Sequence, residues 1–210
     1  MGCFFGVTPF EDERQVYGSL FFLLWKWMVR PRLSRGEGHM NTTPLLLCPV
    51  LIDNQWTIPD VEHASPVHNP STGEVIAEVP LCGRDVVNEV VASSLRAFPR
   101  WGKSPPIERA RILFRYKMLL EEHFEELAES ITREHGKTLT EARGDVRRGV
   151  EVVEYACGAP ELLKGESLQN IADGIDCISI REPVGVCAGI CPYNFPALVP
   201  MWMYPMAMAC

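Results

Sequence analysis

The sequence has no strongly basic stretch and none of the common metal-binding motifs. Its 210 residues contain no run of five or more basic residues and carry a formal net charge of -7, so we expect no nucleic-acid partner. No two of the eight cysteines form a CxxC pair and no HExxH motif occurs, so no metal site is predicted. Cysteines scattered through apolar surroundings favour a reducing, cytoplasmic-type compartment.

The sequence also lacks an apolar run long enough to be a stable membrane span. Residues 16–29 form an apolar run of 14 residues interrupted by Lys26, whereas a helix needs about 20 apolar residues to cross a bilayer. Acidic residues precede this run, which disfavours a secretory signal or a mitochondrial presequence. Two interpretations of residues 1–39 remain, a weak membrane-associating segment or a non-native extension upstream of an initiator at Met40. We favour the second.

From residue 40 onward the sequence is typical of a folded domain. Hydrophobic residues make up 47% and charged residues 22% of the chain, as in ordinary soluble proteins. Residues 51–58 and 65–80 have the β-branched and turn residues of short strands, and the second stretch turns at residues 69–73. Asp85 is a candidate N-cap for a helix that ends before Pro99. Its expected buried stripe consists of Val87, Val91, Ser94 and Phe98.

Two further helices are predicted. The first begins with Ser104 as a cap and Pro105 in the first turn and continues to Gly136, because apolar residues recur every three or four positions. The second spans about residues 139–157, and its interior Gly144 and Gly149 each cost about 1 kcal/mol relative to alanine. Another element is therefore expected to pack against the helix backbone there. The predicted buried face of this helix consists of Ala142, Val146, Gly149, Val153 and Ala156.

A buried strand and a buried helix are predicted toward residue 210. After a loop over residues 158–174, residues 184–191 are almost continuously apolar, which is typical of a strand covered on both faces in a parallel sheet. A turn at residues 192–196 then leads into the helix. The resulting order β, α, α, α, β, α favours an α/β fold, in which ligands bind beyond the carboxyl ends of the strands.

Asn194 is a polar amide within an apolar stretch, between two aromatic residues and two prolines. Its expected position, after a buried strand and before a helix, allows its side chain to point into a ligand crevice. A primary amide offers two donors that stay neutral at any pH, as an oxyanion hole requires. The alternative interpretation is that Asn194 only satisfies backbone groups of the turn.

Several stretches resemble the NAD(P)-dependent aldehyde dehydrogenase family. GICPYNFP at residues 189–196 resembles the family's PWNFP-type motif, and NPSTGEVIAEVP at residues 69–80 resembles its N-terminal signature hairpin. Residues 144–168 and 174–210 are similar to the methylmalonate-semialdehyde branch, which is CoA-acylating. The resemblance covers about residues 50–210. It implies the N-terminal part of the aldehyde dehydrogenase fold, an incomplete Rossmann-like cofactor-binding domain.

The resemblance implies a reaction and a set of site residues. A cysteine thiolate adds to malonate or methylmalonate semialdehyde, hydride passes to NAD, and coenzyme A takes the acyl group to give acetyl-CoA or propionyl-CoA. Asn194 is then the oxyanion donor. Residues Ile190, Cys191, Pro192 and Tyr193 are expected to lie along the cofactor, mainly through backbone and ring contacts. A homo-oligomer is implied as well.

Arg148 matches the arginine that binds the substrate carboxylate in this branch, and the planar guanidinium suits a carboxylate. The alternative is an ion pair with Asp145 on the surface of the same helix. Arg147 is expected to pair with Glu151, four residues further on.

The sequence departs from the family beyond these motifs. The family's ribose-binding lysine and glutamate, its catalytic glutamate and its nucleophilic cysteine all fall past position 210, and no GxGxxG phosphate loop is present. Cys210 is not expected to be a nucleophile, because no base or cation neighbours it in sequence. Residues 40–210 are therefore expected to be an incomplete N-terminal portion of an NAD-binding domain, inactive by itself. The alternatives are a non-catalytic protein with an oligomerisation or interaction role and a membrane-anchored binding module.

Overall fold

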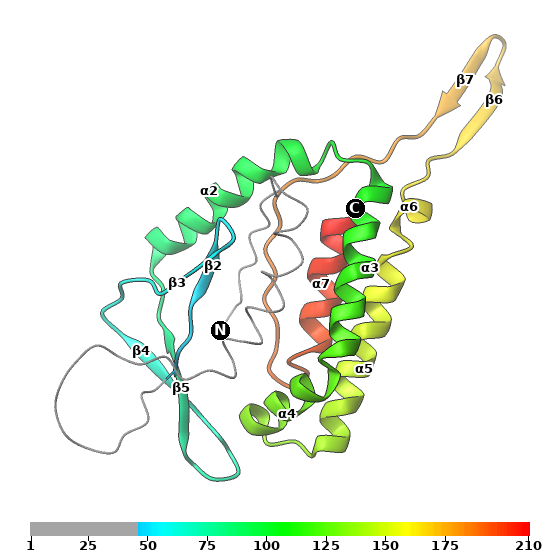
Figure 1. Cartoon of the computed structure of the whole chain (residues 1–210). Helices are drawn as coiled ribbons and strands as arrows, with labels where there is room; N and C mark the ends of the chain where they lie inside the picture. Colours follow the sequence, from blue (N-terminus) through cyan, green and yellow to red (C-terminus); the bar gives the residue numbers. More distant parts are fainter. Residues whose placement is uncertain (1–45) are drawn as a thin grey trace.

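The computed structural model describes residues 46–210 and combines small β-structures with a bundle of helices (Figure 1). The interpretations of residues 1–39 and of Met40 as an initiator lie outside the described residues. The helices found in residues 46–210 all fall short of the length and apolar character that a membrane span requires. In the same part of the chain, no group of three or more His, Cys, Asp or Glu side chains could hold a metal ion.

The N-terminal part contains two small sheets, as the turn and β-branched residues predict. In the larger sheet, the strand at Val75–Pro80 (β5) is central, and it pairs in parallel with Leu46–Leu47 (β1) and antiparallel with Ala64–His68 (β4). The smaller sheet is a two-stranded antiparallel hairpin. Asp53 and Asn54 connect the hairpin with φ angles of 47° and 58°, which asparagine and aspartate tolerate better than most residues. The strands are β1 (Leu46–Leu47), β2 (Val50–Ile52), β3 (Gln55–Thr57), β4 (Ala64–His68) and β5 (Val75–Pro80).

Helix α2 (Arg84–Trp101) confirms the first predicted helix but differs in its ends and its buried face. Gly83, not Asp85, is the N-cap, and the helix continues through Pro99. The missing N–H of Pro99 costs one bond near the last turn, where Leu95 is exposed and water can satisfy its carbonyl. Val91 is exposed, and the fully buried residues are Val90, Ser93 and Ala97.

The long helix predicted to end at Gly136 is two helices, α3 (Pro106–Glu122) and α4 (Phe124–His135). His123 separates them with φ −102° and ψ 22°, and its Nδ1 lies 3.1 Å from Glu126 Oε2 in the first turn of α4. The buried imidazole of His123 and its contact with Glu126 favour the break over one continuous helix. The apolar residues nevertheless keep their helical spacing across the break, which is why the sequence predicted a single helix. Ser104 is not the cap, because its hydroxyl donates to the Trp101 carbonyl. Gly136 ends α4 with φ 81°, as predicted.

Helix α5 (Leu139–Ala156) lies within one residue of the predicted limits, and all five residues of its predicted face are buried. Thr138 and Glu141 form a capping box at its start. The expectation that another element packs against the interior glycines is confirmed at Gly149, where a Cβ would meet Met201 Sδ at 2.5 Å. It is wrong at Gly144, where no other element comes within 4 Å of an added Cβ.

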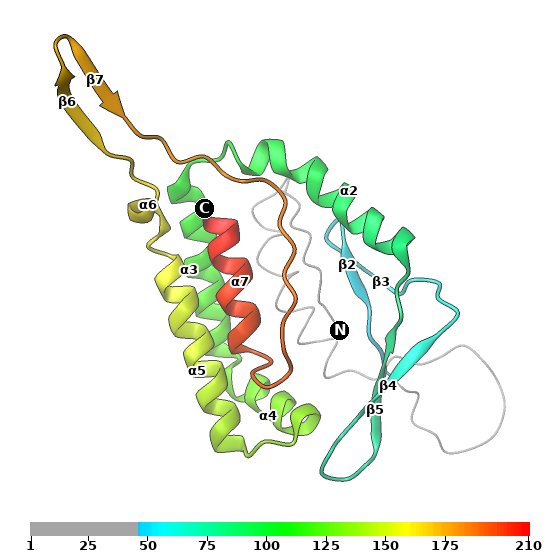
Figure 2. The same cartoon turned by 180° about the vertical axis from the view of Figure 1, so that it is seen from behind.

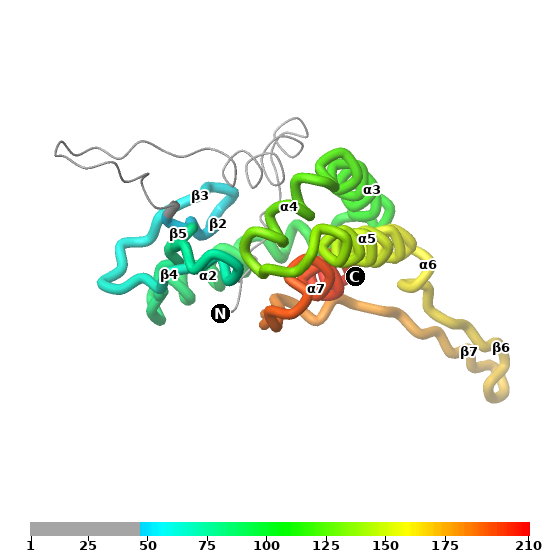
Figure 3. The backbone as a smooth tube through the Cα atoms, turned by 90° about the horizontal axis from the view of Figure 1, so that it is seen from below, coloured from blue at the N-terminus to red at the C-terminus, as the bar shows by residue number. Residues whose placement is uncertain are grey.

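Residues 158–196 differ most from expectation. The predicted loop contains the short helix α6 (Ala159–Leu162) and a strand, β6 (Ser167–Ala172), which forms a hairpin with β7 (Ile175–Ile178). This exposed hairpin projects away from the helices (Figures 1 and 3). The buried strand predicted at residues 184–191 is wrong, since this segment is extended without strand pairing and Val184 is 96% exposed. A strand covered on both faces needs hydrogen-bonding neighbours, and residues 46–210 supply none for it.

Helix α7 (Leu198–Ala209) confirms the predicted buried helix and packs against α5 and α3 (Figure 2). Side chains from other helices hold the carbonyls at its C-terminal end. Trp101 Nε1 donates to Met208 O at 2.9 Å, and the buried Arg109 Nε donates to Ala209 O at 2.9 Å. The central core is formed by Leu120, Ala128, Ile131, Ala142, Val146, Val150, Val153 and Met201.

Candidate functional site

Asn194 lies in the turn immediately before α7, with an exposed side chain. Its backbone carbonyl accepts a hydrogen bond from Lys137 Nζ at 2.9 Å. Its side-chain amide makes no hydrogen bond to another residue of the described chain. The backbone of Asn194 is therefore anchored while its amide remains available to a ligand.

Asp145 anchors the start of α7 from the neighbouring helix α5. Its side chain is 0% exposed, and its Oδ1 accepts a hydrogen bond from the Leu198 backbone N–H at 2.8 Å. Its Oδ2 lies 3.0 Å from Lys137 Nζ, which is 10% exposed and also sits 4.7 Å from the centre of the Phe195 ring. A negative carboxylate at a helix N-terminus also interacts favourably with the helix dipole.

The pairing of Lys137 with Asp145 was not predicted from the sequence, although a signal was present. The alternative pairing of Asp145 with Arg148 on the helix surface is wrong, because Asp145 is bound to Lys137 and Leu198. Asp145 follows Ala142 by three residues and precedes Gly149 by four, so it falls on the predicted buried face of α5. A carboxylate on a buried face needs a partner, and that requirement is the sequence signal for this pair.

Arg148 is exposed on α5, and within residues 46–210 no side chain forms an ion pair with it. It lies three residues, and therefore one helical turn, beyond Asp145. Arg147 is bound elsewhere: its Nη1 lies 2.8 Å and 3.0 Å from the two carboxylate oxygens of Glu121, and its guanidinium stacks on Phe124. The expected pair of Arg147 with Glu151 is wrong, because α3 approaches this side of α5. The hydrogen bond from Arg147 is the main cause of a lowered pKa at Glu121.

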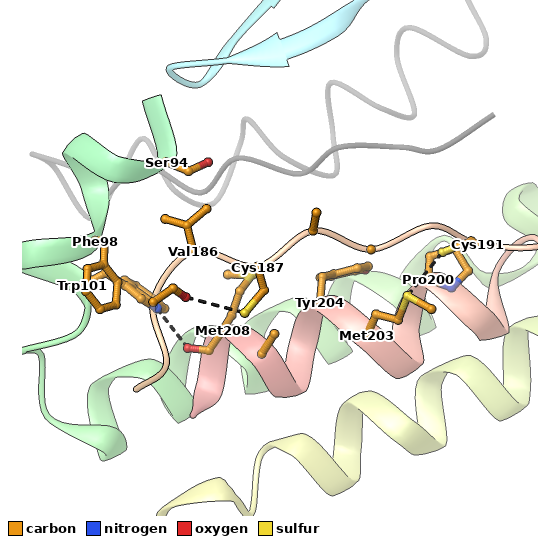
Figure 4. A pocket seen from close by; sticks show the side chains of 14 residues that line it. Ser94, Phe98, Trp101, Val186, Cys187, Cys191, Pro200, Met203, Tyr204 and Met208 are labelled. Carbon is orange, nitrogen blue, oxygen red and sulfur yellow. Dashed lines mark hydrogen bonds between the residues drawn. The ribbon is translucent and has the colours of Figure 1, made fainter. Parts of the chain in front are cut away.

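A cavity of about 220 Å³ lies between α2, the extended segment at residues 185–191 and α7 (Figure 4). Its lining is mostly apolar. The hydroxyl of Tyr204 is hydrogen-bonded to that of Tyr116 within the bundle, and burial raises the pKa of Tyr116 to about 12. The labelled lining residues are Ser94, Phe98, Trp101, Val186, Cys187, Cys191, Pro200, Met203, Tyr204 and Met208.

The four residues expected along a cofactor lie together in the segment that borders this cavity. Ile190 is 74% exposed, Pro192 and Tyr193 are also exposed, and Cys191 is partly buried with its Sγ 3.7 Å from Met203 Sδ. An exposed aliphatic side chain, an aromatic ring and backbone without strand partners fit one face of a planar, hydrogen-bonding ligand. These residues supply no charged group for a phosphate.

The cysteines of the described chain form no disulfide. Burial raises the pKa of Cys82, Cys157 and Cys191, so these three thiols resist forming the thiolate that a nucleophile requires. Cys210 is partly buried, with its Sγ 3.6 Å from Met206 Sδ.

Comparison with known proteins identifies one family. A model of the aldehyde dehydrogenase family matches residues 56–210. Malonate-semialdehyde dehydrogenase of Bacillus pumilus (strain SAFR-032) is 46% identical over 171 residues, which are 81% of this chain and 35% of that protein. Malonate-semialdehyde dehydrogenase of Pseudomonas aeruginosa is 48% identical over 157 residues, covering 75% of this chain and 32% of that protein.

Solved structures agree in fold. The crystal structure of methylmalonate-semialdehyde dehydrogenase (DddC) from Oceanimonas doudoroffii superimposes with a TM-score of 0.74 at 47% identity and covers 76% of this chain and 33% of that one. A candidate methylmalonate-semialdehyde dehydrogenase from Sinorhizobium meliloti 1021, solved in complex with NAD, gives a TM-score of 0.77 at 40% identity, covering 80% and 34%. The expected α/β fold class, matching the N-terminal part of these structures, is confirmed. The chain spans about a third of the length of the relatives it matches.

Proposed function

Because the chain belongs to the aldehyde dehydrogenase family, we propose that it forms part of an enzyme that oxidises malonate or methylmalonate semialdehyde with NAD and coenzyme A. The products are acetyl-CoA and propionyl-CoA. Support comes from the relatives, which are named for these two semialdehydes and share nearly half of their aligned residues with this chain. In the same proposal, residues 46–210 belong to the NAD-binding domain, and the protein works in a reducing, cytoplasmic-type compartment.

The proposed reaction needs a group that stabilises a developing negative charge. A cysteine thiolate adds to the aldehyde carbon, and the carbonyl oxygen becomes an oxyanion until hydride leaves the same carbon. The resulting thioester loses its β-carboxylate as CO₂, and the carbon left with the electron pair takes up a proton from solvent. The thiol of coenzyme A then displaces the enzyme cysteine, which leaves as a thiolate. In this scheme the Asn194 amide donates a hydrogen bond to the oxyanion. Removing one such donor typically costs a hundred- to a thousandfold in rate.

The observation that carries this proposal is that Asn194 and Arg148 are both exposed, with side chains that bind no other residue of the described chain. The exposed amide of Asn194 belongs to a residue whose backbone carbonyl is bound by Lys137. Arg148 is an exposed cation on α5, three residues beyond Asp145, whose carboxylate accepts the Leu198 N–H. A substrate with an aldehyde and a carboxylate needs both kinds of group. Arginine can bind the carboxylate through two parallel hydrogen bonds.

NAD fits the segment beside the cavity in part. NAD supplies the hydride acceptor when bound, and we propose that Ile190, Cys191, Pro192 and Tyr193 contact it through backbone and ring surfaces. These residues present an exposed apolar face to a planar ring. We assign the nucleophile to none of Cys82, Cys157 and Cys191, because burial raises the pKa of each. We also exclude Cys210, whose Sγ lies against Met206.

The test is a substrate-specific effect of Arg148→Leu in the protein expressed from its own gene. The KM for malonate semialdehyde should rise about 10- to 100-fold, because a hydrogen-bonded charge pair contributes about 1.5–3 kcal/mol. The rate with propionaldehyde, which has no carboxylate, should stay within about twofold of the unmodified protein. Arg143→Leu is the control, since Arg143 lies on the same helix and pairs with Glu125 on the surface. Equal losses with both aldehydes would contradict the proposed role of Arg148.

A second candidate is a non-catalytic interaction role, favoured by the hairpin β6–β7. All residues of both strands are exposed, and Leu168, Ile171, Ile175 and Ile178 are each more than half exposed. We propose that a second copy of the protein covers these side chains in a homo-oligomer. An absence of NADH formation together with a dimer or larger species that Ile175→Lys dissociates would favour this role alone.

A further inference from the structure

A single lysine links the three segments that meet at the start of α7. Lys137 lies between two fixed helix ends, because Gly136 closes α4 in a left-handed conformation and Thr138 opens α5 with the capping box. A side chain added at Gly136 would meet Pro70 Cγ at 2.6 Å, so the β4–β5 turn also packs against this corner. The neighbouring residues thus fix the backbone of Lys137 independently of its side-chain contacts.

The side chain of Lys137 donates to two acceptors. Its Nζ lies 3.0 Å from Asp145 Oδ2 and 2.9 Å from the Asn194 carbonyl oxygen, while Asp145 Oδ1 accepts the Leu198 N–H at 2.8 Å. The turn at residues 194–198 is therefore held at both ends by the Lys137–Asp145 pair. The ammonium also lies over the ring of Phe195, the residue between these two anchors.

The pair is expensive to bury for stability alone. Moving a lysine and a carboxylate out of water is unfavourable for each ion, and apolar residues of similar volume often give equal or greater stability. What an apolar pair could not supply is a donor to Asn194 O and an acceptor for the Leu198 N–H. Fixing that carbonyl limits rotation of the Asn194 backbone and thus the direction from which its side chain leaves.

We propose that Lys137 and Asp145 are positioning residues that aim the Asn194 amide at the reacting oxygen, an inference that rests on the proposed function. Neither side chain touches the substrate in this scheme. Both act through the carbonyl of Asn194 and the first amide of α7. A misplacement of about 1 Å at a catalytic group can cost on the order of a hundredfold in rate.

The test compares Lys137→Met with the double variant Lys137→Met/Asp145→Asn, both in the protein expressed from its own gene. Methionine keeps most of the lysine stem but removes the donor. The double variant also removes the buried charge that the single variant leaves unpaired, and an amide oxygen at position 145 can still accept from Leu198. Lys164→Met is the control, because Lys164 pairs with Glu161 on the surface.

Two readouts separate positioning from folding. We expect both variants to lower kcat about 10- to 100-fold while the KM for malonate semialdehyde changes less than about threefold. Amide hydrogen exchange of residues 194–199 should become at least about tenfold faster, with exchange in α2 unchanged. A double variant with unchanged kcat and unchanged exchange at residues 194–199 would overturn the proposal. So would a loss of kcat that only follows the fraction of unfolded protein. If the unmodified protein oxidises no semialdehyde, the proposed function fails, and the exchange rates alone decide whether Lys137 holds the turn.

Discussion

Replacing Gly149 by alanine should weaken the contact between α5 and α7. A Cβ at this position would lie 2.5 Å from Met201 Sδ and 3.6 Å from Leu198 Cα. Met201 is buried in the central core, so its sulfur cannot simply move into solvent. The thioether must find another rotamer within the core, or α7 must shift away from α5.

Two opposing terms set the expected size of this effect. Alanine is more favourable than glycine in a helix interior by about 1 kcal/mol, and overpacking a core costs about 1–3 kcal/mol. The net change for Gly149→Ala is therefore between about zero and 2 kcal/mol of destabilisation. Gly144→Ala on the same helix adds a carbon that no other element approaches within 4 Å, so it should gain the helix term alone, about 1 kcal/mol.

Urea unfolding followed by circular dichroism compares the two variants directly. The free energy of unfolding should be about 1–3 kcal/mol higher for Gly144→Ala than for Gly149→Ala, with equal m-values. Because both substitutions add one methyl group to the same helix, differences in the unfolded state largely cancel. Equal stabilisation by both variants would show that the flexible Met201 side chain changes its conformation without an energetic cost, and it would contradict this prediction.

Two further predictions concern stability. Leu120→Ala should lower the free energy of unfolding by about 2–5 kcal/mol in the same assay, because Leu120 is fully buried in the core. Leu95→Ala should change this free energy by less than about 0.5 kcal/mol, because Leu95 is exposed. Similar losses at both sites would contradict the described core. Hydrogen bonds from the side chain and backbone of Thr138 lower the pKa of Glu141, so its ionised form stabilises α5 above the usual glutamate pKa of about 4.3, and this contribution is lost as the pH falls through the lower folded value. The melting temperature of Glu141→Gln should accordingly fall below that of the unmodified protein near neutral pH and approach it as the pH is lowered to about 3, and a constant difference would refute the role of the charge.

Local signals in the sequence predicted a large part of the fold. Gly136 at a helix end and the turn ending at Gly73 each determine the backbone within a few residues. The stripe of α5 was correct because small and apolar residues at helical spacing bury the same face whichever element covers it. These features depend on neighbours in sequence and can therefore be predicted from sequence.

Features that depend on distant partners were predicted poorly. The apolar spacing of α3 continues into α4, so only the conformation of His123 and its contact with Glu126 reveal the break. The run at residues 184–191 has the composition of a buried strand, but composition cannot supply the strands that would pair with it. Arg147 was assigned to Glu151 by helical spacing, whereas packing of α3 brings Glu121 closer.

Asn194 combines both situations. Its place before a helix was predicted from the prolines and the apolar run, and the structure confirms α7 beginning at Leu198. Lys137 and Asp145 anchor its turn by binding Asn194 and Leu198, which lie 57 and 53 residues further along the chain, beyond the reach of any local pattern. Because Asp145 lies on the buried face of α5, its charge could be recognised as needing a partner, but Arg148, three residues further on, offered a local alternative. Lys137, and not Arg148, is the partner of Asp145, because its ammonium reaches the buried carboxylate while Arg148 is exposed to solvent. The same burial leaves Arg148 outside the pair, and its contact with a substrate carboxylate stays a prediction.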